Sequence, residues 1–145
     1  QCLVGSERCI RDRVSGVGVR LPSHLTATGR AILSALPRNQ VRALYPNRQA
    51  FTDRTGIGPK SPKELEATLA ETQRTGFAEE HGDVTPGFDS YAVAVRDYND
   101  FPIAGLALTF VSGSLRPEQE RSLKTKLRLA GTELSRRLGA VGSLT

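Results

Sequence analysis

Two hydroxyl side chains, Ser90 and Thr109, stand among very small residues on two predicted strands. Side chains alternate between the two faces of a strand, so each hydroxyl shares a face only with residues at even offsets from it. The face so defined consists of Ser90, Ala92, Ala94, Gly105, Ala107 and Thr109. Small residues leave volume above a sheet, and hydroxyls place hydrogen-bonding groups in it, which is typical of a small-molecule site. Close packing of a helix against the sheet would explain the same small residues equally well.

A second candidate is the opening turn of a predicted helix, where Ala27 and Thr28 follow His24 and precede Gly29. The free N–H groups and the dipole at a helix start favour a carboxylate or another anion. Alternatively, Thr28 and Gly29 only allow another element to cross the helix closely. We expect His24 to be structural or to lie at the edge of a pocket, because no serine or cysteine nucleophile signature accompanies it.

An acidic cluster, Glu79-Glu80-His81-Gly82-Asp83, contains residue types that bind metals. Adjacent residues of an extended segment point to opposite faces, so at most two of these side chains converge without help. A solvated turn is therefore the favoured interpretation, and we expect neither a metal nor a cofactor.

The two cysteines, Cys2 and Cys9, are the basis of an enzymatic alternative. Two cysteines are too few for a secreted disulfide framework, and reduced, partly buried thiols are the simpler expectation. A thiol redox protein that uses this pair remains the alternative to a binding domain. The sequence offers no paired acids and no nucleophile–base set, so we expect no enzymatic activity.

The composition predicts one soluble domain. The chain has 145 residues, of which 38% are hydrophobic and 24% charged, and no apolar run approaches the roughly 18 to 20 residues that span a membrane. We therefore expect a cytoplasmic location. The net charge is +5, but Lys and Arg are scattered among Asp and Glu, which favours a solvated surface over a nucleic-acid site. Methionine is absent even at position 1, so we expect Gln1 to be an internal residue of a longer polypeptide.

The elements that must position the candidate residues follow from periodicity and capping signals. Residues 1–21 suggest one or two short strands, and residues 88–95 and 102–111 predict two longer ones. Helices are predicted over 23–36, from the capping box at Ser61 to Gly76, and over 117–138. Strands joined by short polar loops and flanked by helices indicate an α+β fold with an antiparallel sheet.

The second face of the predicted sheet is bulky and apolar, and it must be covered. It carries Tyr91, Val93, Val95, Leu106, Leu108 and Phe110. Helix 117–138 has a leucine-rich stripe that suits this role, and we expect helix 23–36 or its neighbour to join it. That stripe is Leu123, Leu127, Ala130, Leu134 and Leu138.

Several segments, in order along the chain, resemble the effector domain of IclR-type transcriptional regulators. The string Leu21-Pro22-Ser23-His24-Leu25-Thr26-Ala27-Thr28-Gly29-Arg30-Ala31-Ile32-Leu33 is similar to the start of that domain. Residues 75–80, 86–97, 105–110 and 134–139 resemble its later segments. Each motif is weak, and their order and spacing make the resemblance fairly specific.

This resemblance implies a GAF-like effector-binding domain over residues 1–145, preceded in the full protein by a winged helix-turn-helix that these residues lack. It also implies a small organic acid or aromatic metabolite as effector, a homodimer or homotetramer, and contact with DNA only through the absent domain. The implied effector contacts are Ala27, Thr28, Glu80, Ser90, Ala107 and Thr109. Many relatives that bind keto acids have aspartate at 80, cysteine at 90 and serine at 107, so no particular effector is transferred to this chain.

Overall fold

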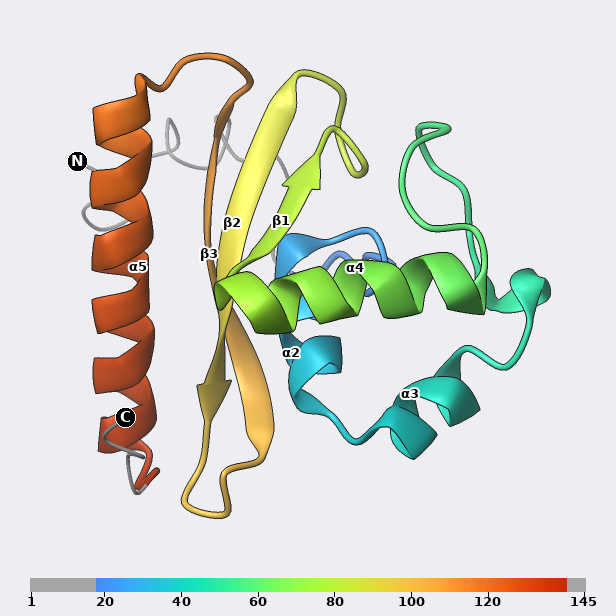
Figure 1. Ribbon diagram of the computed structural model, residues 1–145, viewed down its shortest axis with the longest axis horizontal. Coiled ribbons are helices and arrows are strands. Elements are labelled where there is room, and N and C mark those ends of the chain that lie inside the picture. Colours follow the sequence, from blue (N-terminus) through green and yellow to red (C-terminus); the bar gives the residue numbers. More distant parts are fainter. Residues whose placement is uncertain (1–17, 141–145) are drawn as a thin grey trace.

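In the described part of the chain, a three-stranded antiparallel sheet with helices on both faces forms the centre (Figure 1). The structure, a computed structural model, describes residues 18–140. The strands run in the order β1-β2-β3, and both neighbouring pairs are antiparallel, as the sequence predicts. In chain order the elements are α2 (Ala27–Ala35), α3 (Arg38–Leu44), the 3-10 helix η1 (Arg48–Ala50), α4 (Pro62–Thr75), β1 (Ala78–His81), β2 (Phe88–Arg96), β3 (Pro102–Val111) and α5 (Pro117–Arg137).

Helix α2 begins at Ala27, four residues later than predicted. Ser23 is not its N-cap, because the N–H groups of Leu25 and Thr26 both donate to the carbonyl of Pro22 and close a turn before the helix. Thr26 caps the helix instead: its Oγ1 accepts from the N–H of Gly29 at 3.0 Å. The other predicted strands and helices lie where expected within residues 18–140, and the strands predicted over 1–21 lie almost wholly outside the described residues.

The register of the sheet confirms the predicted small-residue face. Ser90 pairs with Thr109, Ala92 with Ala107, and Ala94 with Gly105. Helix α2 lies directly on part of this face, where Ala27 and Ala31 pack with Ala78 and Ala92, and Ala94 and Ala107 pack around them. A Cβ built on Gly105 would lie 2.8 Å from the Cβ of Thr28. The small residues therefore permit a very close approach of helix and sheet.

Helix α5 covers the bulky face. Phe77, Tyr91, Val93 and Leu127 form its buried cluster, with Leu106, Leu108 and Phe110 partly buried around it. The expectation that helix 23–36 or its neighbour shares this face is wrong. The alanine side of α2 fits the small-residue face instead, α3 and α4 pack with α2, and these helices lie on the side of the sheet opposite α5 (Figure 1).

The predicted leucine stripe of α5 is only partly correct. Leu127 is buried, but Ala130, Leu134 and Leu138 are exposed. The closest approach to the sheet is at Gly131, where an added Cβ would lie 2.5 Å from Cγ2 of Val93. Ser135, one turn further on, also faces the sheet, because its Oγ accepts from the N–H of Arg96 at 3.0 Å. The sheet-facing side is thus centred on Gly131 and Ser135, which leaves Leu134 at its edge, and Leu138 lies at the end of the helix.

A third cluster joins the helices beyond the small-residue face. Leu33, Val41, Leu65 and Leu69 from α2, α3 and α4 are buried together. Full burial of such a side chain contributes about 1.5 to 3 kcal/mol, so this cluster fixes α4 against α2. Gly76 ends α4 in the left-handed conformation, as predicted, with φ 79°. Within residues 18–140, no helix is long and apolar enough to cross a membrane.

Candidate functional site

A row of three polar side chains crosses the sheet at one end of the small-residue face. Glu80 on β1 pairs with Ser90 on β2, which pairs with Thr109 on β3. The Oγ of Ser90 donates to Oε1 of Glu80 at 2.8 Å, and it lies 2.9 Å from Oγ1 of Thr109. Glu80 and Ser90 are buried, whereas Thr109 is exposed. The row therefore runs from a buried carboxylate to an accessible hydroxyl.

The carboxylate fixes the direction of the hydrogen bonds in this row. A hydroxyl has one hydrogen to donate. The hydrogen of Ser90 goes to Glu80, so Thr109 must donate its own to Ser90. Thr109 Oγ1 is then left with lone pairs only. The exposed end of the row can accept a hydrogen bond from a ligand but cannot donate one without breaking the row.

A buried ion pair supports Glu80 from behind. The second carboxylate oxygen of Glu80, Oε2, accepts from the N–H of Asp83 at 3.0 Å. The Asp83 carboxylate forms an ion pair with the Arg30 guanidinium and accepts from the N–H of His81 at 3.1 Å. Arg30 also donates to the carbonyls of His24 at 2.8 Å and Glu79 at 2.7 Å. Both charged side chains are about 5% exposed, so each depends on the other.

Sequence reasoning missed both Arg30 and Asp83 as parts of this site. Arg30 lies on α2 between Ala27 and Ala31, which are both buried. A charge at that helical spacing must find a partner, because arginine is almost never fully buried unpaired. That signal was present, but it could not indicate which of the acids supplies the partner.

The 51–60 loop is fixed against the turn that carries Asp83. Thr55 Oγ1 donates to the carbonyl of Asp83 at 3.1 Å, and Arg54 Nε donates to the carbonyl of Val84 at 2.7 Å. Nε2 of His24, which is 1% exposed, lies 2.9 Å from the carbonyl of Thr52. His24 is thus a buried structural residue at the start of α2, and it contacts the ring of Phe51 edge to face at 5.1 Å.

The six predicted site residues fall into two groups. Glu80, Ser90 and Thr109 are joined by hydrogen bonds. Ala27 and Ala107 belong to the alanine cluster under α2, and half-buried Thr28 lies over Gly105. The packing interpretation therefore describes the part of the face beneath α2, and the hydroxyl-bearing end carries the polar chemistry.

The acidic cluster does not converge on one point. His81 lies 3.4 Å from an oxygen of Glu79 and 3.5 Å from one of Asp89, while Glu80 turns to the other face, toward Ser90. In the part of the chain that the structure describes, no group of three or more metal-binding side chains could hold an ion. The cysteines of the redox alternative, Cys2 and Cys9, lie outside the described residues.

Comparison with known families identifies the domain. The family model described as "Bacterial transcriptional regulator IclR C-terminal" matches residues 5–136. The chain belongs to the IclR family. Because this family consists of transcriptional regulators, the domain is not an enzyme. The match confirms the resemblance drawn from the motifs, and it gives no support to the thiol redox alternative.

This IclR-family domain spans about half the length of the curated relatives that it matches. The HTH-type transcriptional regulator XynR of Escherichia coli K12 is 30% identical over 125 residues, which cover 86% of this chain and 49% of XynR. Among solved structures, the Agobacterium tumefaciens repressor BlcR is 30% identical with a TM-score of 0.81, covering 89% of this chain and 52% of BlcR. The PobR inducer binding domain from Acinetobacter, a double mutant in complex with 3-hydroxybenzoic acid, is 23% identical with a TM-score of 0.68 over 81% of this chain and 67% of PobR.

Proposed function

We propose that this domain binds a small-molecule effector and thereby controls DNA binding by a winged helix-turn-helix elsewhere in a longer, cytoplasmic regulator. The observation that carries the proposal is the directed row Glu80–Ser90–Thr109. A buried carboxylate supported by an ion pair costs stability relative to apolar packing, so a purely structural sheet gains little from it. A row that ends in an accessible acceptor is suited to recognising a ligand.

The proposed effector is a small acid that also carries a hydroxyl or another hydrogen-bond donor. Its donor would bind Oγ1 of Thr109, which has only lone pairs to offer. Its carboxylate would lie at the start of α2, near the N–H groups of Ala27 and Thr28, because Thr26 caps only the N–H of Gly29. A carboxylate placed beside Glu80 would instead be repelled. We propose that Ala107 completes the wall between these two ends.

Hydroxybenzoates are a rational first probe for this site. The PobR domain was solved with 3-hydroxybenzoic acid, a molecule with both a carboxylate and a donor hydroxyl. We therefore propose a melting-temperature screen of hydroxy acids, each paired with the analogue that lacks the hydroxyl. Binding to the native state raises the melting temperature by mass action, so each pair measures the contribution of the donor. A consistent preference for the analogues without a hydroxyl would contradict the proposed polarity of the site.

Thr109→Val tests the accepting end directly. The substitution keeps the shape and removes the acceptor, so a hydroxylated acid should bind about 2- to 12-fold more weakly, the equivalent of about 0.5 to 1.5 kcal/mol. The analogue without the hydroxyl should bind as it does to the parent protein. Calorimetry on both proteins measures the difference, and Thr125→Val, at an exposed position of α5, is the matched control. Equal losses for both ligands would place the donor elsewhere.

We also propose that the domain self-associates, as a homodimer or homotetramer, and that it contacts DNA only through the helix-turn-helix. Residues 1–145 alone should therefore bind duplex DNA weakly, without sequence preference, and lose that binding as salt rises. Electrophoretic mobility shifts between low and physiological salt, together with light scattering, test both statements. A sequence-specific complex that survives salt would contradict the proposal.

A further inference from the structure

A groove of about 780 Å³ runs along the edge of β2, and no residue of the row Glu80–Ser90–Thr109 lines it. It exists because β1 is short: its first residue, Ala78, pairs with Ala92, so beyond Ala92 no strand within residues 18–140 lies beside β2 on that side. Helices α2 and α5 flank this exposed edge from the two faces of the sheet, and the end of α4 forms a third wall. Its volume lies in the range of small-molecule sites, about 300 to 1,000 Å³.

The floor of the groove presents backbone groups of Ala94. The N–H of Gly82 donates to the carbonyl of Phe88, and that of Ser112 donates to the carbonyl of Gly87. Along antiparallel strands, successive residues direct their backbone N–H and C=O groups alternately to the two neighbouring strands. These two bonds therefore show which residues of β2 face β1 and which face β3. Even-numbered residues of β2 turn their N–H and C=O groups toward the β1 side. Beyond Ala92 these are Ala94 and Arg96, and the N–H of Arg96 is already bound by Ser135 Oγ at 3.0 Å.

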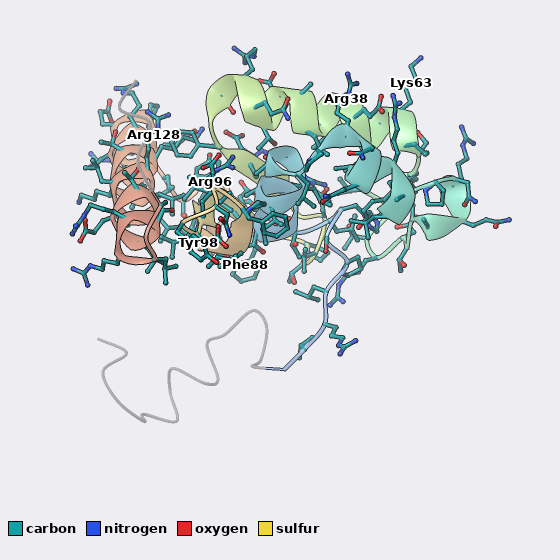
Figure 2. The ribbon with its side chains drawn as sticks, turned by 90° about the horizontal axis from the view of Figure 1, so that it is seen from below. Arg38, Lys63, Phe88, Arg96, Tyr98 and Arg128 are labelled. Carbon is teal, nitrogen blue, oxygen red and sulfur yellow. The ribbon has the colours of Figure 1, made fainter. Side chains whose placement is uncertain are left out.

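Two arginines, Arg96 and Arg128, line the groove together with Asp100, the acidic partner of Arg96. Arg128 on α5 lies 4.6 Å from the centre of the Phe77 ring and donates to the carbonyl of Thr75 at 3.5 Å, and neither contact neutralises its charge. Arg96 on β2 is held by the carbonyl of Asp100 at 2.8 Å and lies 3.3 Å from the Asp100 carboxylate, whose side chain is 80% exposed. Figure 2 shows both arginines in the space between α5 and the helices on the other face.

We infer that this groove is a second ligand site, which binds a small organic anion with two or more carboxylate or phosphate groups. The guanidiniums of Arg96 and Arg128 would bind two of these groups, and the N–H of Ala94 would donate to one of them. Hydroxyls of Ser34 and Thr132 line the same groove. Charge-assisted hydrogen bonds from arginine are among the strongest polar contacts in proteins, and they suit carboxylate and phosphate alike.

A peptide that adds to the sheet is the less suitable occupant. Such binding derives its affinity from a series of main-chain hydrogen bonds along a free edge. Here Ala92 is paired with Ala78, and the N–H of Arg96 is bound by Ser135 Oγ. Between these two residues, only Ala94 directs its N–H and C=O toward the groove. A single residue of free edge is too short to hold an extended segment, whereas one N–H and two guanidiniums are enough for a small anion.

Calorimetry on the 145-residue chain at constant ionic strength tests this site with citrate and pyrophosphate as probes. Arg128→Gln and Arg96→Gln should each weaken the better probe by about tenfold or more. Arg121→Gln changes an exposed residue of α5, the helix that carries Arg128, and lies outside the groove. It should change the affinity by less than about twofold, because a single exposed charge contributes little. The citrate and pyrophosphate arms show which kind of anionic group the site prefers.

Three outcomes would overturn the inference. Neither probe binding with Kd below about 10 mM would show that no such site exists. An equal loss in Arg121→Gln and Arg128→Gln would indicate unspecific attraction to a basic surface. A loss in Thr109→Val without one in Arg128→Gln would assign the anion to the proposed effector site. Because the two sites share no residue, failure here leaves the proposed effector site untouched, and the reverse also holds.

Discussion

Replacing Asp83 by alanine should lower the free energy of unfolding by about 3 to 5 kcal/mol. The loss arises because Arg30, which is 4% exposed, keeps its charge in a buried position without a counter-ion. The carboxylate that accepts from the N–H of His81 also disappears, so the turn behind Glu80 loses a second contact. Urea unfolding followed by circular dichroism measures the change, with an unaltered m-value as the sign that the native state is intact.

The matched controls separate a buried pair from an exposed one. Asp100→Asn removes the charge of a carboxylate that also pairs with an arginine, Arg96 at 3.3 Å, but its side chain is 80% exposed. Asparagine also tolerates the positive φ of 59° at this position, so the substitution should cost less than about 1 kcal/mol. The double variant Arg30→Met/Asp83→Leu should recover much of the stability lost in Asp83→Ala, because it removes both charges and leaves none uncompensated. If Asp83→Ala were as mild as Asp100→Asn, the buried ion pair would not be a major source of stability.

The double variant also tests whether the Arg30–Asp83 ion pair contributes to ligand binding. With stability restored, the backbone N–H at position 83 can still donate to Glu80, but nothing anchors the turn to α2 through Arg30. If the pair serves to hold Glu80 in position, the double variant should fold well, but its preference for hydroxylated acids over the analogues should be weaker than that of the parent. A double variant with unchanged preference would assign the pair to stability alone.

The sequence predicted the two strand faces well, because alternation along a strand needs no knowledge of distant residues. Ser90 and Thr109 were expected on one face, and the register places them opposite each other. The family resemblance then pointed to Glu80, which the structure joins to Ser90. What one sequence could not supply was the partner of Arg30, since Asp83 lies 53 positions away and the chain has several other acids nearby in sequence.

The helix predictions failed where packing, not periodicity, decides the orientation. Leu134 and Leu138 fit a leucine stripe, yet both are exposed. The contacts with the sheet are centred on Gly131 and Ser135, which leaves Leu134 at the edge of the contact, and Leu138 lies at the end of the helix. A prediction from hydrophobicity relies on the large apolar side chains. It does not reveal that a glycine allows the closest contact between a helix and a sheet. The same principle explains α2, which packs on the sheet through Ala27 and Ala31, while its one leucine, Leu33, packs against α3 and α4.

Ala107→Phe should abolish effector binding, with a loss of more than about 100-fold, as expected when a side chain occupies the space of the ligand. Ala107 packs against the alanine cluster, and it lies two residues before Thr109 on the same face of β3. This position is between the two proposed ends of the ligand. We expect a phenylalanine there to project toward the start of α2, into the space that we propose for the effector. Because the cluster is already closely packed, we expect a loss of stability of about 1 to 3 kcal/mol as well.

Ala92→Val is the control that separates these two effects. Ala92 is fully buried under α2 and pairs with Ala107, so overpacking there strains the same helix–sheet contact without reaching toward Thr109. It should lower the melting temperature to a comparable extent and still bind the hydroxy acid that the screen selects. Both variants must be compared below the melting temperature of the weaker one, so that calorimetry reports affinity and not unfolding. If Ala107→Phe bound that acid as the parent does, Ala107 would be a packing residue only, and the effector would lie away from the alanine end of the sheet.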